Sequence, residues 1–253
     1  MSDFHFHFSM VDEGETSRHW PLVTWSLVLI NIAVYAAMKW SDTDYDELVQ
    51  AYSLTPQSLQ WWQFVSSSFM HANVFHLIAN LVVLLVLGDN VEDVLGPVPF
   101  LALYLLGGFA GDALMVLANP DMAIPSLGAS GCIATIAGAY AVLFWNSMIE
   151  LDVCISWIYF VVPVPALLFL VFLMATDVAL TIRYAAELGP GGGVNYVAHG
   201  VGFVVGTVAG MWVLNRGAVA RYRKFREGHL LFGYLPLAIA SPVRQPARAR
   251  RTR

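Results

Sequence analysis

The chain has 253 residues, of which 58% are hydrophobic and only 12% are charged. A soluble globular protein has about 25% charged residues, so this composition excludes an ordinary water-soluble fold and places most of the chain in lipid or against buried helices. The net charge of −5 is unevenly spread: ten of the 13 Lys and Arg residues lie from Arg216 onward, and the N-terminal tail is acidic.

Six segments are apolar enough to span a bilayer, which takes about 20 consecutive residues, with a range near 17–25. We therefore predict an all-α integral membrane protein, a bundle of six transmembrane helices. In chain order the predicted spans are 21–38, 72–87, 97–118, 128–146, 155–182 and 194–214.

The connections carry further signals. Residues 39–70 contain Trp61 and Trp62 and suit a segment in the membrane interface, where amphipathic rings prefer to lie. The fifth predicted span contains Pro163 and Pro165, so we expect it to start at the interface or to bend there.

The C-terminal third adds two segments outside the predicted spans. A glycine-rich stretch at 189–193 predicts a hinge-like loop, and 230–240 predicts an interfacial or loosely packed tail segment. We thus divide the chain into an N-terminal tail (1–20), a six-helix membrane domain (21–215) and a basic C-terminal tail (216–253).

The positions of Lys and Arg near the span ends predict orientation. With six spans both tails share one side, which holds Arg18 and the basic residues from Arg216 onward, whereas the other side holds only Lys39 and Arg183. We expect the protein to lie in the plasma membrane of a prokaryote, with both termini in the cytoplasm. The second, fourth and sixth helices then start on the non-cytoplasmic side.

Polar side chains gather at the starts of these three helices. The second helix has His71, His76 and Asn80, the fourth has Ser130, and the sixth has His199. Helices that run the same way place these groups at one depth. Because polar groups in lipid are costly, such residues indicate function.

Small residues follow the serine and the histidine along one face of each helix. Ala134 and Gly138 continue the serine face, and Gly202, Gly206 and Gly210 continue the histidine face. Small residues at this spacing let membrane helices approach closely, so we expect the two side chains to meet.

The expected contact between Ser130 and His199 predicts nucleophilic catalysis. An imidazole within hydrogen-bond reach can activate a serine hydroxyl, so Ser130 is the expected nucleophile and His199 the expected base. His76 and Asn80, four residues apart on one helix face, and the backbone N–H of Ser130 can stabilise an oxyanion. We expect a dyad, because we place Asp112 and the other intramembrane aspartate, Asp177, deeper or on odd-numbered helices.

Three motifs in order resemble those of rhomboid proteases. They are His71-x4-His76-x3-Asn80, the GxSG motif at 128–131 and the AHxxG motif at 198–202. The resemblance covers about residues 60–214 and implies a six-helix core. It implies that Ser130 is the nucleophile and His199 the base.

The resemblance also implies the supporting residues and the substrate. His76, Asn80 and the Ser130 amide match the oxyanion site; supporting positions are His71, Gly128, Gly131 and Gly202. Rhomboids cut single-span membrane proteins near their outer ends. The loop 189–193 matches the cap, and the fifth helix matches the lateral gate. We expect no cofactor, no metal and no nucleic-acid partner; the partners are substrate and lipid bilayer.

Three positions depart from the family pattern: Gln63 follows Trp62 where arginine is common, Val94 replaces an arginine after Glu92, and Ala134 replaces an aromatic residue. These changes concern loop anchoring and histidine orientation.

Two other classes compete with a protease. A rhomboid-like pseudoprotease would bind membrane-protein clients without cleavage, but such proteins usually lack the serine or the histidine. A transporter or channel is suggested by Asp112 and Asp177, but the symmetric broken helices expected of a transporter are not evident. A zinc metalloprotease is disfavoured because the chain has no HExxH motif.

Overall fold

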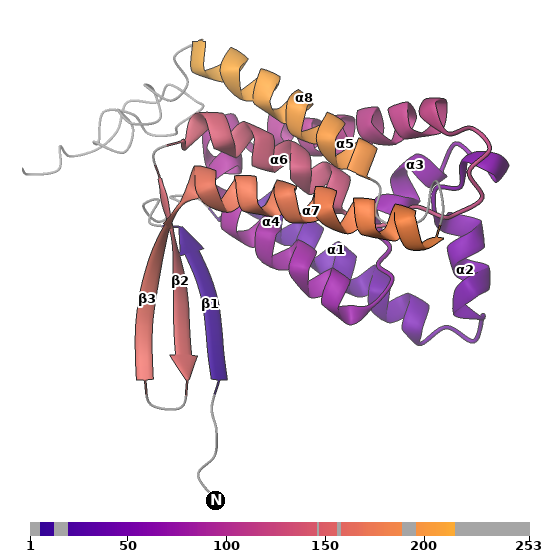
Figure 1. Cartoon of the computed structure of the whole chain (residues 1–253), viewed down its shortest axis with the longest axis horizontal. Helices are drawn as coiled ribbons and strands as arrows, with labels where there is room; N and C mark the ends of the chain where they lie inside the picture. The colour runs from indigo at the N-terminus through magenta and orange to yellow at the C-terminus, as the bar shows by residue number, and fades with distance from the viewer. Residues whose placement is uncertain (1–5, 13–19, 146, 156–157, 189–195, 216–253) are drawn as a thin grey trace, which may run out of the picture.

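The computed structural model describes residues 6–12, 20–145, 147–155, 158–188 and 196–215 (Figure 1). The loop 189–193, the tail segment 230–240 and the rest of the C-terminal tail lie outside these residues. In chain order the helices are α1 (Leu22–Lys39), α2 (Tyr45–Tyr52), η1 (Pro56–Ser58), α3 (Gln63–Ser66), η2 (Ser67–Phe69), α4 (Val74–Leu95), α5 (Pro97–Ala118), α6 (Ser130–Leu143), α7 (Ala166–Leu188) and α8 (Tyr196–Asn215).

Among the described residues, four helices are long and apolar enough to cross a membrane: α1, α4, α5 and α8. Helix α6 has 14 residues, and the stretch of α7 whose side chains are described, Ala166–Thr176, is a shorter apolar helix segment. At 1.5 Å per residue, α6 is about 21 Å long, shorter than a hydrocarbon core of about 30 Å. The fold is mostly helical, and the structure supports four of the six predicted spans by length and composition.

Helix α6 lies at the centre of the bundle, between α4, α5 and α8 (Figure 1). Its side chains Ile136 and Tyr140 are completely buried, as are Phe100 and Tyr104 of α5. A helix that neighbouring helices cover on most sides does not need to reach both lipid surfaces. Its first residue, Ser130, can therefore lie below the surface of the bundle.

The expectation of an all-α protein is wrong in one region. Three antiparallel strands form a sheet in the order β1 (Phe6–Asp12), β2 (Met148–Ile155) and β3 (Ile158–Pro165). The sheet lies at the end of the bundle where α6 ends and α7 begins, away from α2 and α3 (Figure 1). The helix in the region of the fifth predicted span, α7, thus starts at Ala166 and not at residue 155, and β1 occupies part of the predicted N-terminal tail.

The cause is the composition of this region. Residues 158–164 are mainly β-branched and aromatic, which favours strands, and Pro163 and Pro165 disfavour a helix interior. Since Pro163 and Pro165 are in β3, on the edge of the sheet, their missing N–H groups break no central ladder.

The connection between α1 and α4 folds over the opposite end of the bundle as α2, η1, α3 and η2. Trp61 is 80% exposed, whereas Gln63 is buried and its side chain bonds to the backbone of Gln60 and Ala51. Gln63 therefore anchors this connection with neutral hydrogen bonds. The interfacial position of the connection stays a prediction.

Glu92 joins the start of α1 to the end of α4. Its carboxylate accepts hydrogen bonds from the backbone N–H groups of Val23 (3.0 Å) and Thr24 (2.8 Å) and from the Thr24 hydroxyl (2.8 Å). Helix α1 has no side-chain cap from its own N-cap residue, Pro21. Glu92 thus satisfies amide groups that a helix start leaves without partners, and its charge suits the positive end of the helix dipole.

We expect Glu92→Ala to lower the free energy of unfolding by about 2–4 kcal/mol, because buried N–H groups lose a charged acceptor. Thermal unfolding in detergent measures this change. Glu47→Ala, which removes an exposed carboxylate from α2, is the matched control and should stay within about 0.5 kcal/mol of wild type. Equal effects of the two substitutions would contradict the capping role of Glu92.

Candidate active site

The loop before α6 brings Ser130 close to α4. The N–H of Gly128 donates to the carbonyl of Ser67 (2.9 Å), and Gly128 has a φ of +129°. A Cβ atom at Gly128 would lie 2.8 Å from Cε1 of His76. Only glycine fits this position, because of both its backbone conformation and the neighbouring ring.

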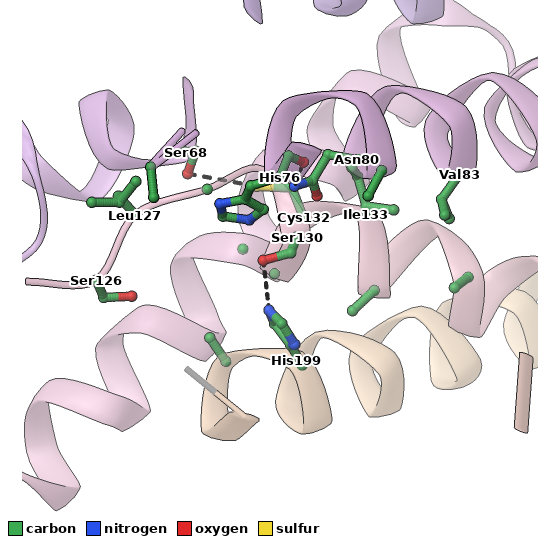
Figure 2. A pocket seen from close by; sticks show the side chains of 18 of the residues that line it. Ser68, His76, Asn80, Val83, Ser126, Leu127, Ser130, Cys132, Ile133 and His199 are labelled. Carbon is green, nitrogen blue, oxygen red and sulfur yellow. Dashed lines mark hydrogen bonds between the residues drawn. The ribbon is translucent and has the colours of Figure 1, made fainter. Parts of the chain in front are cut away.

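Ser130 and His199 are in direct contact. The distance between Ser130 Oγ and His199 Nε2 is 2.6 Å, and His199 is buried (Figure 2). When Nε2 carries no proton, the serine hydroxyl donates to it, as nucleophile activation requires. The structure thus brings together the two residues that the sequence paired.

Backbone contact between α6 and α8 makes this distance possible. A Cβ atom on Gly202 would lie 2.5 Å from the carbonyl oxygen of Gly131, and one on Gly206 would overlap with the carbonyl oxygen of Thr135. Gly138 would likewise overlap with the carbonyl of Phe203. The predicted small-residue contact is present, although on α6 it runs through Gly131, Thr135 and Gly138, and Ala134 lines the cavity instead.

His76 and Asn80 of α4 face the same place. Both line the cavity that contains Ser130, and Figure 2 shows them on the side of Ser130 opposite His199. The Asn80 amide donates one N–H to the carbonyl of His76 (2.9 Å). An amide group has a second N–H, which can serve a ligand.

Asn73 is a residue that sequence reasoning missed. It is the N-cap of α4, and its side chain accepts a hydrogen bond from the backbone N–H of His76 (2.9 Å). The signal was present in the sequence, since asparagine is a favoured N-cap residue. Asn73 fixes where α4 begins and so where the His76 ring lies.

His71 lies outside α4 and does not line the cavity. It is fully buried, its ring is 5.1 Å from the His76 ring, and its carbonyl accepts the Tyr45 hydroxyl (2.7 Å). Burial, with a smaller contribution from His76, lowers the pKa of His71 from 6.5 to about 4. This environment suits a neutral ring that supports the loop.

The lowered pKa of His71 predicts acid sensitivity. The unfolded chain takes up a proton at His71 below pH 6.5, whereas the folded chain takes it up only near pH 4. Above pH 6.5 His71 is neutral in both states and the free energy of unfolding does not depend on its titration. As the pH falls from 6.5 toward 4, the free energy of unfolding decreases by up to about 3 kcal/mol. Thermal unfolding in detergent between pH 7 and pH 4 measures this loss. His71→Asn should give a shallower pH dependence, and equal slopes for variant and wild type would contradict the assignment.

A cavity of about 600 Å³ joins Ser130 and His199 to His76 and Asn80. It is lined by the loop before α6 and by α4, α5, α6, α7 and α8, and the part from α7 comprises Leu173, Met174 and Thr176. Asp112 of α5, which the sequence led us to place deeper or on an odd-numbered helix, also lines it. The cavity can hold a short extended peptide segment beside a paired serine and histidine, an arrangement suited to acyl transfer.

The Rhomboid domain family matches residues 58–216. RHOMBOID-like protein 1 of Arabidopsis thaliana is 31% identical over 173 residues, 68% of this chain and 39% of that protein. Rhomboid protein 1, mitochondrial, of Saccharomyces cerevisiae is 27% identical over 213 residues, 81% of this chain and 56% of that protein. Rhomboid-like protease 3 of Toxoplasma gondii is 30% identical over 175 residues, 58% of this chain and 66% of that protein.

The chain therefore belongs to the rhomboid family and is an integral membrane protein, and the resemblance inferred from its motifs is confirmed. The chain spans little more than a third of the Arabidopsis protein and about half of the yeast protein. Similar proteins include mitochondrial and chloroplastic ones, so family membership does not support the expected location in a prokaryotic plasma membrane.

Proposed function

We propose that this protein is an intramembrane serine endopeptidase that cleaves single-span membrane proteins with Ser130 as nucleophile and His199 as base. The observation that carries the proposal is the 2.6 Å contact between Ser130 Oγ and His199 Nε2 inside a cavity of a largely apolar bundle. Membership in a family whose relatives include a named protease supports it.

In the first half of the reaction, Ser130 Oγ attacks the carbonyl carbon of the substrate while its proton passes to His199 Nε2. The carbonyl oxygen becomes negative, and donors from His76, Asn80 and the backbone N–H of Ser130, at the start of α6, stabilise it. When this intermediate collapses, the C–N bond breaks and His199 gives its proton to the leaving amine. The acyl group stays on Ser130.

In the second half, His199 takes a proton from a water molecule, which attacks the acyl carbon. The same donors stabilise the second oxyanion. The bond to Ser130 Oγ then breaks, His199 returns the proton to the serine, and the carboxylic acid product leaves. Each donor of this kind contributes about 2.7–4 kcal/mol to transition-state stabilisation.

Entry of the substrate follows from the lining of the cavity. Leu173, Met174 and Thr176 of α7 face it, so we propose that a substrate helix approaches along α7 and unwinds there. Unwinding is required because the amides of a helix are shielded by their own turn. We also propose that α6 and α7 complete a six-helix membrane core, that the loop 189–193 covers the cavity, and that both termini share the side rich in Lys and Arg.

The experiment that tests this function uses the whole chain in liposomes with a panel of tagged single-span proteins. We expect at least one substrate to be cut at a single bond near one end of its span, as mass spectrometry of the two products identifies. His199→Ala in the same liposomes is the control. Substrates that co-purify with the protein and stay intact would contradict a protease and favour the pseudoprotease alternative.

A further inference from the structure

A carboxyl group enters the same cavity as the serine and the histidine. Asp112 of α5 lines it together with Ser130 and His199, which come from α6 and α8. The peptide-cleavage mechanism above does not use Asp112. A carboxyl group in the cavity is the group best suited to recognise a hydrogen-bond donor.

Close helix packing sets the depth of Asp112. A Cβ atom on Gly111 would lie 2.7 Å from Cα of Ala198, and one on Gly108 would overlap with the sulfur of Cys132. Helix α5 thus contacts α8 at Ala198, which precedes His199, and it contacts α6 at Cys132, two residues after Ser130. Asp112, next to Gly111 and one turn from Gly108, lies at the level of the Ser130–His199 contact.

Polar groups gather on this side of the cavity. The Cys132 sulfur and the Ser68 hydroxyl lie 3.7 Å apart, and both residues line the cavity with Gly108 and Asp112. The α7 side is formed by Leu173, Met174 and Thr176 and is more apolar. The cavity lining therefore includes polar side chains besides Asp112, whereas its α7 part is more apolar.

A peptide carbonyl placed for attack by Ser130 has its oxygen toward His76 and Asn80. The side chain of the same substrate residue then extends into the space next to Ser130. We propose that Asp112 is a specificity-determining residue, which binds a hydroxyl group on the side chain of the substrate residue whose carbonyl is attacked. This inference rests on the proposed protease function.

Two single-span substrates that differ only at that residue, with serine in one and alanine in the other, test the inference. Wild type should cleave the serine substrate with a kcat/KM about tenfold higher, because one hydrogen bond to a carboxyl group distinguishes the two. In Asp112→Ala the ratio should fall to within about twofold of unity. Asp121→Ala, which removes an exposed carboxylate outside the cavity, is the matched control and should keep the wild-type ratio.

Asp112→Asn keeps the size of the side chain and provides a second variant if Asp112→Ala unfolds; its ratio should lie between those of wild type and unity. A ratio near unity in wild type, or a ratio that Asp112→Asn leaves unchanged, would overturn the inference. Equal slowing of both substrates in the variants would also overturn it. The two substrates are built on a single-span protein that wild type cuts in the liposome panel, so these outcomes leave the protease function intact. Failure of wild type to cut any member of that panel would remove both proposals.

Discussion

Ser130→Ala should lower the cleavage rate of a single-span substrate by a factor of about 10⁴ or more while the protein stays folded. The reason is chemical: the substitution removes the proposed nucleophile beside His199, and the residues of a nucleophile–base pair act as a unit. Among the described residues the hydroxyl bonds to His199, and the loss of one hydrogen bond should change the unfolding free energy by only about 1 kcal/mol. Product formation in liposomes and thermal unfolding in detergent measure the two effects.

Ser126→Ala is the matched control. Ser126 lines the same cavity, but Figure 2 shows it away from the Ser130–His199 contact. This variant should retain activity within a few-fold of wild type. Cleavage by Ser130→Ala at more than about a hundredth of the wild-type rate would remove Ser130 from the mechanism.

Gly206→Ala should disrupt both the fold and the site. A Cβ atom at Gly206 would overlap with the carbonyl oxygen of Thr135, and a backbone carbonyl in the middle of α6 cannot move without the helix. Helices α6 and α8 must then separate, which we expect to cost about 3 kcal/mol or more and to move His199 away from Ser130. The thermal midpoint in detergent and the cleavage rate should both fall.

Gly200→Ala makes the same chemical change on the same helix, one residue from His199. No atom lies within 4 Å of a Cβ atom at that position among the described residues. This variant should be as stable as wild type or more stable by up to about 1 kcal/mol, because alanine is the better helix former. If the two variants behaved alike, the contact between α6 and α8 would not be what holds the site together.

The contact between Ser130 and His199 was predictable from the sequence because it depends on local signals. Both residues stand near the starts of apolar helices that run the same way, and glycines follow at helical spacing. The position of His76 followed from the same reasoning, and Gly128 explains how its ring comes near the loop. Sequence motifs and helix periodicity were sufficient for this part of the site.

The sheet and Asp112 were not predictable in the same way. An apolar run such as 155–165 fits a strand as well as a helix. The sheet that it joins also depends on the pairing of β1 with β2, which links residues as far apart as Phe6 and Ile155. The depth of Asp112 in the bundle depends on how closely α5 approaches α6 and α8. Gly108 and Gly111 make this close approach possible, but the sequence does not say which residues of α6 and α8 they contact. Sequence periodicity predicts which face of a helix is buried, but it does not predict how far the helix is shifted along its axis relative to its neighbours.

The most direct measurement of the central claim is the reaction of the intact protein with a fluorophosphonate probe, which modifies activated serine hydroxyls, followed by mass spectrometry of the labelled peptide. We expect one modified residue, Ser130, and a labelling rate that falls by at least about 100-fold in His199→Ala because the base that takes up the proton is gone. Modification of other serines alone, or an unchanged rate in His199→Ala, would contradict the pairing of Ser130 with His199 as nucleophile and base.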